Sequence, residues 1–314
     1  MAMEEIRSKH LRWINITEVN DLNAPEIKYL KKNFGFHPLN LKDCVIRGQR
    51  PKIDEYEEYL FLVFLFPYYN RKTREIQPAE VDFFVSKDYI ISVHENQLSE
   101  IVGLFNHLKK TKNLQEREEL LSNNAIIFLY TMLKSLLSYC LPILDHLSID
   151  INKIEKHIFN GQEKDMVQEI LITRRNIVNF RKTMVAHKNV LKKLKEANHS
   201  LKIFDPEKAD VYLNNLIEHT KEIWDSLESS REAIEALRDT NESLISFRLN
   251  EIMKTFTIIS VVIFILTLVA TILSVGAPGT PVIHWPLGFW LIILIEIIVA
   301  FLVITFFKRR KWLE

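Results

Sequence analysis

One run of 69 residues, Glu207 to Val275, contains neither glycine nor proline. Asp205 and Pro206 stand just before it, and a capping residue followed by proline is a typical helix start. With a rise of about 1.5 Å per residue, a single helix over 206–275 would be roughly 100 Å long. Its soluble half carries apolar residues on one face, at steps of three, four or seven residues, so we expect it to pack against other helices of the chain, against neighbouring copies, or against both. These residues are Leu213, Leu216, Ile223, Leu227, Ile234, Leu237 and Leu244.

The end of this run has the length and composition of a membrane span. Thr255 to Val275 contains no charged residue, and at about 1.5 Å per residue it matches the roughly 30 Å hydrocarbon core of a bilayer. Leu287 to Phe307 is a second apolar run, and two Gly and three Pro within 276–286 predict a non-helical loop between them. A buried soluble hairpin is the alternative, but the paired lengths favour two transmembrane helices.

Basic residues set the orientation of the two spans. Lys308 to Lys311 follow the second span, in a basic tail over 308–314, and Arg248 and Lys254 precede the first. The loop over 276–286 contains no Lys or Arg, so it is predicted to be external. We therefore expect a multi-pass protein of the cell membrane with both termini cytoplasmic.

The preceding part of the chain predicts two soluble regions. Residues 114–200 are predicted to form a helical hairpin: a helix over 124–155 with a kink at Pro142, a turn at Asn160 and Gly161, and a charged helix over 164–197. Residues 1–113 are predicted to form an α/β domain, with strands at 59–66, 81–85 and 89–93 and helices at 22–34 and 98–110. The lone Cys44 and Cys140 are interpreted as core residues. The fold class is therefore an α+β cytoplasmic domain, a long helical stalk and two C-terminal transmembrane helices, mostly helical.

Several short segments along the chain form a recognisable series. They are Phe36 to Asp43 (FHPLNLKD), Gln49 to Lys52 (QRPK), Tyr56 to Phe61 (YEEYLF), Asn250 to Lys254 (NEIMK) leading into Thr257 to Ser260 (TIIS), and Phe306 to Leu313 (FFKRRKWL). In order and spacing, these segments resemble the family of CorA-type divalent metal ion transporters. The resemblance implies a funnel-shaped homopentamer in the lipid bilayer, with the first membrane helix lining a central pore. The implied ligand is a divalent cation, first Mg²⁺, with Zn²⁺ or Co²⁺ as alternatives, both transported and regulatory, and no organic cofactor.

Pore-lining positions follow from the same alignment and from steps of three or four residues: Asn250, Met253, Phe256, Ser260, Phe264, Thr267, Thr271 and Ser274. Met253, Phe256 and Phe264 would form apolar rings that gate by excluding water. The hydroxyl groups would meet a hydrated ion. The alternative is that the hydroxyls bond to carbonyl groups of their own helix and the phenylalanines pack against neighbours.

One departure from the family pattern concerns the entrance of the pore. The family carries a Gly-Met-Asn triplet at the external end of the first span, and Ser274, Val275 and Gly276 occupy that filter position here. Ile265 replaces a family proline, and the external loop contains no acidic residue. Two functions remain: a channel-like transporter with an altered selectivity entrance, and a CorA-fold membrane sensor or scaffold that does not conduct.

Five charged or polar residues are further candidates. Asp239 matches a family aspartate that binds a regulatory divalent ion, with Glu75 and Glu80, in a segment between two strands, as candidate partners; the alternative is a solvated stalk charge. Glu296 is the one charge in the second span, either a protonated residue bonded to Ser or Thr of the first span or a proton-coupling site. His284 is either a ligand for a softer metal or an interfacial residue.

Composition argues against two other classes. The chain has 41 basic and 40 acidic residues, so no basic patch points to nucleic acid. Its seven glycines form no P-loop, GxGxxG or GxSxG motif. We therefore expect neither an enzyme nor an ATP-driven pump.

Overall fold

The computed structural model describes residues 3–111, 118, 121, 124–201, 204–275 and 286–310. The chain divides into two compact units, Met1–Arg238 and Asp239–Glu314. The strands are β1 (Met3–Arg7), β2 (Arg12–Thr17), β3 (Lys52–Glu55), β4 (Leu60–Asn70), β5 (Glu75–Val85) and β6 (Tyr89–His94). The helices are α1 (Pro25–Phe34), α2 (Pro38–Asp43), α3 (Ser99–Lys110), α5 (Ala125–Phe159), α6 (Glu163–Met184), α7 (His187–Leu201), α8 (Pro206–Ser274) and α9 (Gly288–Arg309).

The first unit is built on one six-stranded sheet with the order β1-β2-β6-β5-β4-β3. Only the β2–β6 pair is parallel among the strand pairs of the described residues. The three predicted strands coincide with β4, β5 and β6, but β4 and β5 are longer than their apolar segments, and Pro67 pairs with Pro78 within their ladder. Glu75 and Glu80 therefore lie inside β5, and the prediction that they lie between two strands is wrong. The apolar runs mark only the most buried part of each strand.

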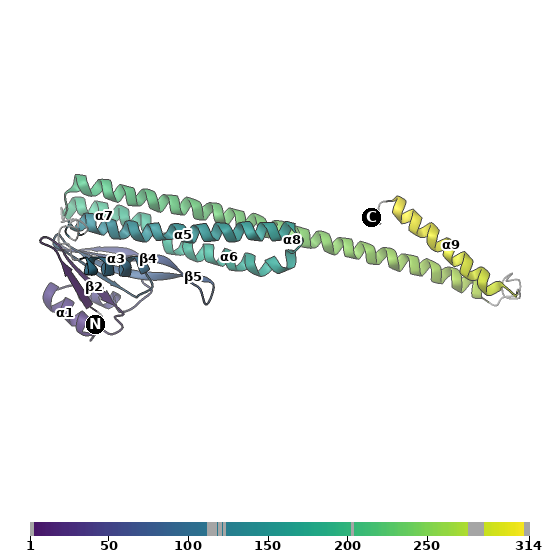
Figure 1. The fold of residues 1–314 in the computed structure, drawn as a ribbon, viewed down its shortest axis with the longest axis horizontal. Helices are drawn as coiled ribbons and strands as arrows, with labels where there is room; N and C mark the ends of the chain where they lie inside the picture. Colours follow the sequence, from purple (N-terminus) through teal and green to yellow (C-terminus); the bar gives the residue numbers. More distant parts are fainter. Residues whose placement is uncertain are drawn as a thin grey trace. The chain divides into compact units, whose positions relative to one another are not determined.

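Helices cover both faces of the sheet. On one face, Ile27 and Leu30 of α1 and Leu41 of α2 pack with Phe61 and Phe84. On the other face, Trp13 of β2 contacts Phe105 of α3 and Phe128 of α5, with ring centroids 5.0 and 5.1 Å apart. Figure 1 shows α3 and α5 together over the sheet, with α1 on the opposite side. Alternation of side chains along each strand supplies these two apolar layers.

The predicted hairpin consists of three helices rather than two. α5 continues through Pro142, a turn follows at Asn160, and the charged segment is divided into α6 and α7 around residues 185–186. The single helix predicted over 164–197 is therefore wrong. No Gly or Pro marks this break. The ring of His187, at the start of α7, is buried against Phe64 and Phe66. The break between α6 and α7 therefore coincides with tertiary packing rather than with a local sequence signal.

α5 is apolar enough to cross a membrane by composition, yet half of its most apolar stretch is buried inside the chain. Its inward side chains, among them Phe128, Leu133, Leu136 and Cys140, are at most 1% exposed. The corresponding stretches of α8 and α9 are only 6% and 0% buried. α5 is thus the central core helix of the first unit, whereas α8 and α9 present their apolar side chains outward.

α8 is one helix of 69 residues that begins in the first unit and continues into the second. Within the first unit it packs on its neighbours through Tyr212, whose ring lies 4.8 Å from that of Tyr130, and through Trp224, which lies beneath the guanidinium group of Arg181. The second unit contains the rest of α8 and α9. The fold class predicted from the sequence is confirmed.

Candidate functional site

The predicted pore-lining residues lie on one exposed stripe of α8. Met253, Phe256 and Phe264 are 62%, 68% and 70% exposed, and Asn250, Ser260, Thr267, Thr271 and Ser274 are also exposed. Steps of three and four residues keep them on one side of the helix. The half-buried residues of the same span, such as Val262, Leu266, Val269 and Leu273, follow a different face. The stripe is therefore available to a pore, to lipid or to another copy of the chain, and its edge at Thr267, Thr271 and Ser274 borders a groove that α9 also lines.

The hydroxyl groups of this span donate to carbonyl groups of their own helix. Oγ1 of Thr267 donates to Ile263 O at 2.8 Å, Oγ1 of Thr271 to Thr267 O at 2.7 Å, and Oγ of Ser274 to Thr271 O at 3.0 Å. Ser260 donates in the same way to Phe256 O at 2.9 Å. Each hydroxyl has a single proton but two acceptor lone pairs. The back-bonded geometry thus occupies the donor and leaves the oxygen able to accept a bond from the water of a hydrated ion.

Only part of the entrance lies in the described chain. α8 ends at Ser274, and Val275 follows it with 52% of its surface exposed. Gly276 of the filter position and His284 of the loop lie outside the described residues. Ser274 supplies a hydroxyl group at the last residue of α8. In the family pattern, the amide side chain comes two positions later.

Glu296 lies on the face of α9 that borders α8. It is half-buried, as are Ile292, Val299 and Val303 at steps of three or four along the same face. One groove of about 440 Å³ is lined by Glu296 together with Leu266, Thr267, Ala270, Thr271, Ser274 and Ile292. The carboxyl group therefore shares a groove with three hydroxyl groups of the first span.

The acidic residues assigned to regulation occupy different environments. Glu75 pairs with Arg175 of α6 at 2.8 Å. The Glu80 side chain is 5% exposed, and its Oε2 accepts bonds from the backbone N–H groups of Gly48 and Gln49 at 2.7 and 2.8 Å. Glu80 is therefore enclosed in the first unit, which argues against it as a ligand at a subunit interface. Asp239 is exposed on α8. Within the described residues, no group of three or more His, Cys, Asp or Glu side chains could hold a metal ion.

A buried charge cluster beside Glu80 was not predicted from the sequence. Nη1 of Arg47 lies 3.6 Å from Oδ2 of Asp82 and 3.8 Å from Oε1 of Glu80, and the Asp82 side chain is fully buried. Burial raises the pKa of Asp82 to about 8, and the negative charge of Glu80 contributes to this shift. Burial also raises the pKa of Glu80 above its ordinary value. The sequence does contain a signal for this cluster: Glu80 and Asp82 are two residues apart, and so on one face, in a strand whose other inward residues are apolar.

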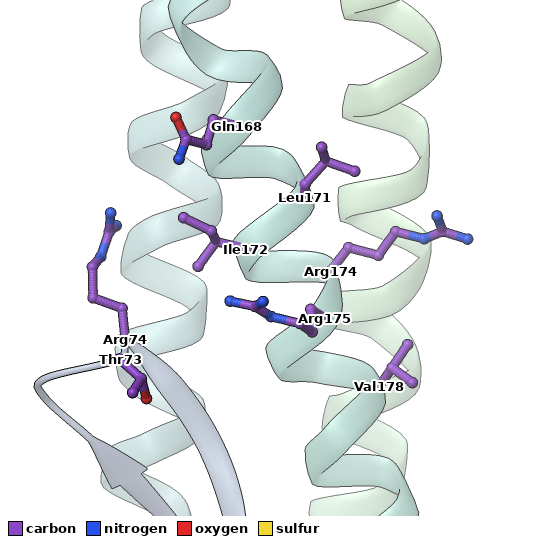
Figure 2. Close-up of a pocket in the computed structure, with 8 residues that line it drawn as sticks. All are labelled: Thr73, Arg74, Gln168, Leu171, Ile172, Arg174, Arg175 and Val178. Carbon is purple, nitrogen blue, oxygen red and sulfur yellow. The ribbon is translucent and has the colours of Figure 1, made fainter.

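A surface depression of about 750 Å³ lies between the β4–β5 turn and α6, lined by Thr73, Arg74, Gln168, Leu171, Ile172, Arg174, Arg175 and Val178 (Figure 2). Arg74 binds both carboxylate oxygens of Glu169, at 3.0 and 2.6 Å. The Asn176 side chain accepts a bond from Ile76 N and donates one to Arg74 O, both at 3.0 Å. These contacts fasten the strand turn to α6, so we interpret this depression as structural.

The chain has clear relatives among known proteins. It matches the family described as CorA-like Mg²⁺ transporter protein over residues 8–309. The cobalt/magnesium transport protein CorA of Thermotoga maritima is 28% identical over 302 residues, covering 96% of this chain and 83% of that protein. The complete structure of the CorA magnesium transporter from Methanocaldococcus jannaschii covers 99% of this chain and 94% of its own, with a TM-score of 0.81 and 20% identity. The full-length CmaX protein matches 96% of this chain and 88% of its own, with a TM-score of 0.71 and 20% identity.

At 20% identity, the two solved structures establish a shared fold. The family match extends from just before β2 through α9 and thus includes five of the six strands of the sheet and the exposed stripe of α8. The family description is that of a transporter, which agrees with the expectation that the chain is not an enzyme. The chain belongs to the CorA-like Mg²⁺ transporter family.

Proposed function

We propose that this protein conducts a divalent cation passively across the cell membrane, through a pore formed by several copies of the chain. Mg²⁺ is the first candidate, followed by Co²⁺ or Ni²⁺ and Zn²⁺. The observation that carries the proposal is the exposed stripe on α8, in which polar and apolar side chains share one face of a helix that continues into the predicted membrane span. The names of the relatives, which include cobalt and magnesium transport proteins, support the choice of ion.

Self-association follows from the physics of the stripe. A single helix cannot enclose a conduit, and within the span the polar groups of Thr267 and Thr271 are more stable where they face protein or water. Copies arranged around an axis would direct these groups to the centre and cover the adjacent apolar faces. A homopentamer is the arrangement that we propose, in line with the family resemblance.

The stripe also suggests where conduction is controlled. Rings of Met253, Phe256 and Phe264 would exclude water from the conduit unless the helices separate, which is a hydrophobic gate. The hydroxyl groups of Thr267, Thr271 and Ser274 would bond to the water shell of an ion, which suits Mg²⁺ because this ion gives up its water reluctantly. The entrance formed by Ser274 and Val275 would select less strictly than an amide ring does.

Asp239 remains our candidate for a regulatory ion site. It is exposed on α8, and a divalent ion shared with an acidic residue of a neighbouring copy would cancel repulsion between the two carboxylates. Loss of that ion would let the subunits separate. Glu80 is not retained in this role because its carboxylate is enclosed and bonded to backbone N–H groups.

Ion flux into liposomes tests the proposal. Purified full-length protein is reconstituted into vesicles that contain a Mg²⁺-sensitive or Zn²⁺-sensitive dye, and an inward-negative potential is applied. We expect dye signals above those of protein-free vesicles. The absence of flux for Mg²⁺, Co²⁺, Ni²⁺ and Zn²⁺ would favour a sensor or scaffold instead. A Val275→Met, Gly276→Asn double variant that conducts Mg²⁺ faster than the wild type would show that the entrance limits the rate.

A further inference from the structure

The carboxyl group of Glu296 is the single formal charge among residues 255–307. A carboxylate at this depth is costly unless it has a partner, and such a residue defaults to a functional role. Glu296 is half-buried on the side of α9 that faces the shared groove, together with hydroxyl groups from three turns of α8. The groove contains a concentration of oxygen atoms that an ordinary contact between apolar helices lacks.

The hydrogen-bond directions decide what this groove can accept. The protons of Thr267, Thr271 and Ser274 are donated to carbonyl oxygens of α8. The hydroxyl oxygens are therefore left with lone pairs, and an ionised Glu296 also offers only lone pairs. A groove that contains acceptors alone repels an anion and attracts a species that is positively charged or carries several donors.

The groove has room for such a species. Six water molecules at about 30 Å³ each occupy roughly 180 Å³, so an octahedral Mg²⁺ with its water shell fits within the groove of about 440 Å³. The protons of that shell point outward and would bond to the carboxylate and hydroxyl oxygens. A single proton on Glu296 would supply one donor for these oxygen atoms, whereas the water shell of a divalent ion supplies several.

We propose that Glu296, with the hydroxyl oxygens of Thr267, Thr271 and Ser274, binds a hydrated divalent cation within the membrane. Glu296 supplies the negative charge that the external loop lacks, and the hydroxyl groups orient the water shell of the ion. As a step in conduction this site rests on the proposed transport function, but binding at the site is measurable without transport.

The test is Mn²⁺ binding to full-length protein in detergent micelles, followed by electron paramagnetic resonance of free Mn²⁺. Mn²⁺ is chosen because it prefers the same oxygen ligands as Mg²⁺. We expect Glu296→Gln to bind one Mn²⁺ fewer per chain than the wild type, or to bind that ion at least about tenfold more weakly. We expect Thr267→Val to weaken the same ion about three- to tenfold, as the loss of one hydrogen bond predicts.

Thr305→Val is the matched control, because Thr305 of α9 also donates to its own helix, at 2.7 Å to Phe301 O, but does not line the groove. Mn²⁺ binding by this variant should equal that of the wild type. Gel filtration verifies that each variant keeps the oligomeric state of the wild type, and the conservative Thr267→Val change keeps the test decisive if Glu296→Gln does not fold.

Equal Mn²⁺ binding by the wild type, Glu296→Gln and Thr267→Val would overturn the site and leave the transport proposal intact. Proton uptake that depends on Glu296 and that excess Mn²⁺ does not displace would assign the groove to a proton and would also overturn it. A third outcome separates the two proposals. If the wild type shows no ion flux, and Glu296→Gln binds one Mn²⁺ fewer per chain than the wild type, the site is supported and the transport function is rejected.

Discussion

Replacing Asp82 by asparagine should make the first unit more stable at alkaline pH. The folded protein holds the Asp82 proton up to about pH 8, whereas the unfolded chain releases it near the ordinary value of 3.8. Between these values the folded state binds more protons than the unfolded state, so stability falls as pH rises. Asp82→Asn removes this titration but keeps the shape and neutrality of the protonated side chain.

The magnitude follows from the width of the pH interval. One pKa unit corresponds to about 1.4 kcal/mol, so three units between pH 5 and pH 8 give a ceiling of about 4 kcal/mol. Water penetration and relaxation lower the cost of a buried charge. We therefore expect the advantage of Asp82→Asn over the wild type to grow by about 2–4 kcal/mol from pH 5 to pH 8.

Urea unfolding of the full-length protein in detergent, followed by the fluorescence of the buried Trp13, measures this difference. Glu95→Gln is the matched control, since Glu95 lies 4.0 Å from the same Arg47 but is 40% exposed, and exposed pairs contribute at most about 1 kcal/mol. Parallel pH profiles for Asp82→Asn and the wild type would refute the reasoning. A variant that becomes relatively less stable toward pH 8 would also refute it.

Three further predictions concern the core and the conduit. Phe128→Ala removes a ring that is fully buried against Trp13 and should lower the unfolding free energy by about 3–5 kcal/mol in urea titrations; a loss below 1 kcal/mol would contradict this packing. Burial lowers the pKa of His187 to about 4, so the unfolded chain binds more protons between pH 4 and pH 6.5 and stability falls as pH drops. His187→Phe should reduce this loss of unfolding free energy between pH 6.5 and pH 4 by up to about 3 kcal/mol. An unchanged loss would show that other groups cause it. Phe264→Ala should raise Mg²⁺ flux in liposomes by opening an apolar ring, and unchanged flux would place the ring outside the conduit.

The long helix and the strands were predictable because their signals are local. Asp205 and Pro206 mark the start of α8, the absence of Gly and Pro sustains it, and the structure ends it at Ser274, just before the Gly- and Pro-rich loop. The apolar segments of β4, β5 and β6 identified the centre of the sheet. Which face of α8 approaches an axis stays a prediction from the family pattern.

Features set by tertiary packing were not predictable. The break between α6 and α7 accompanies the burial of His187, and the buried contact between Arg47 and Asp82 joins residues 35 positions apart that no motif connects. α5 is as long and apolar as a membrane span, and only its contact with the sheet shows it to be a core helix. The rotation that places Glu296 beside Thr267 also depends on helix packing, because two uniformly apolar spans carry almost no periodic signal.

The most direct test of the account is the accessibility of two adjacent positions to a water-soluble, positively charged thiol reagent during ion flux. Thr271 lies on the stripe and Ile272, 59% exposed at the same depth, lies about 100° around the helix. Both natural cysteines, Cys44 and Cys140, are fully buried, so background reaction should be low. We predict that the reagent blocks divalent-cation flux through Thr271→Cys and leaves Ile272→Cys unaffected. Equal block of both variants, or block of Ile272→Cys alone, would contradict a conduit lined by this face of α8.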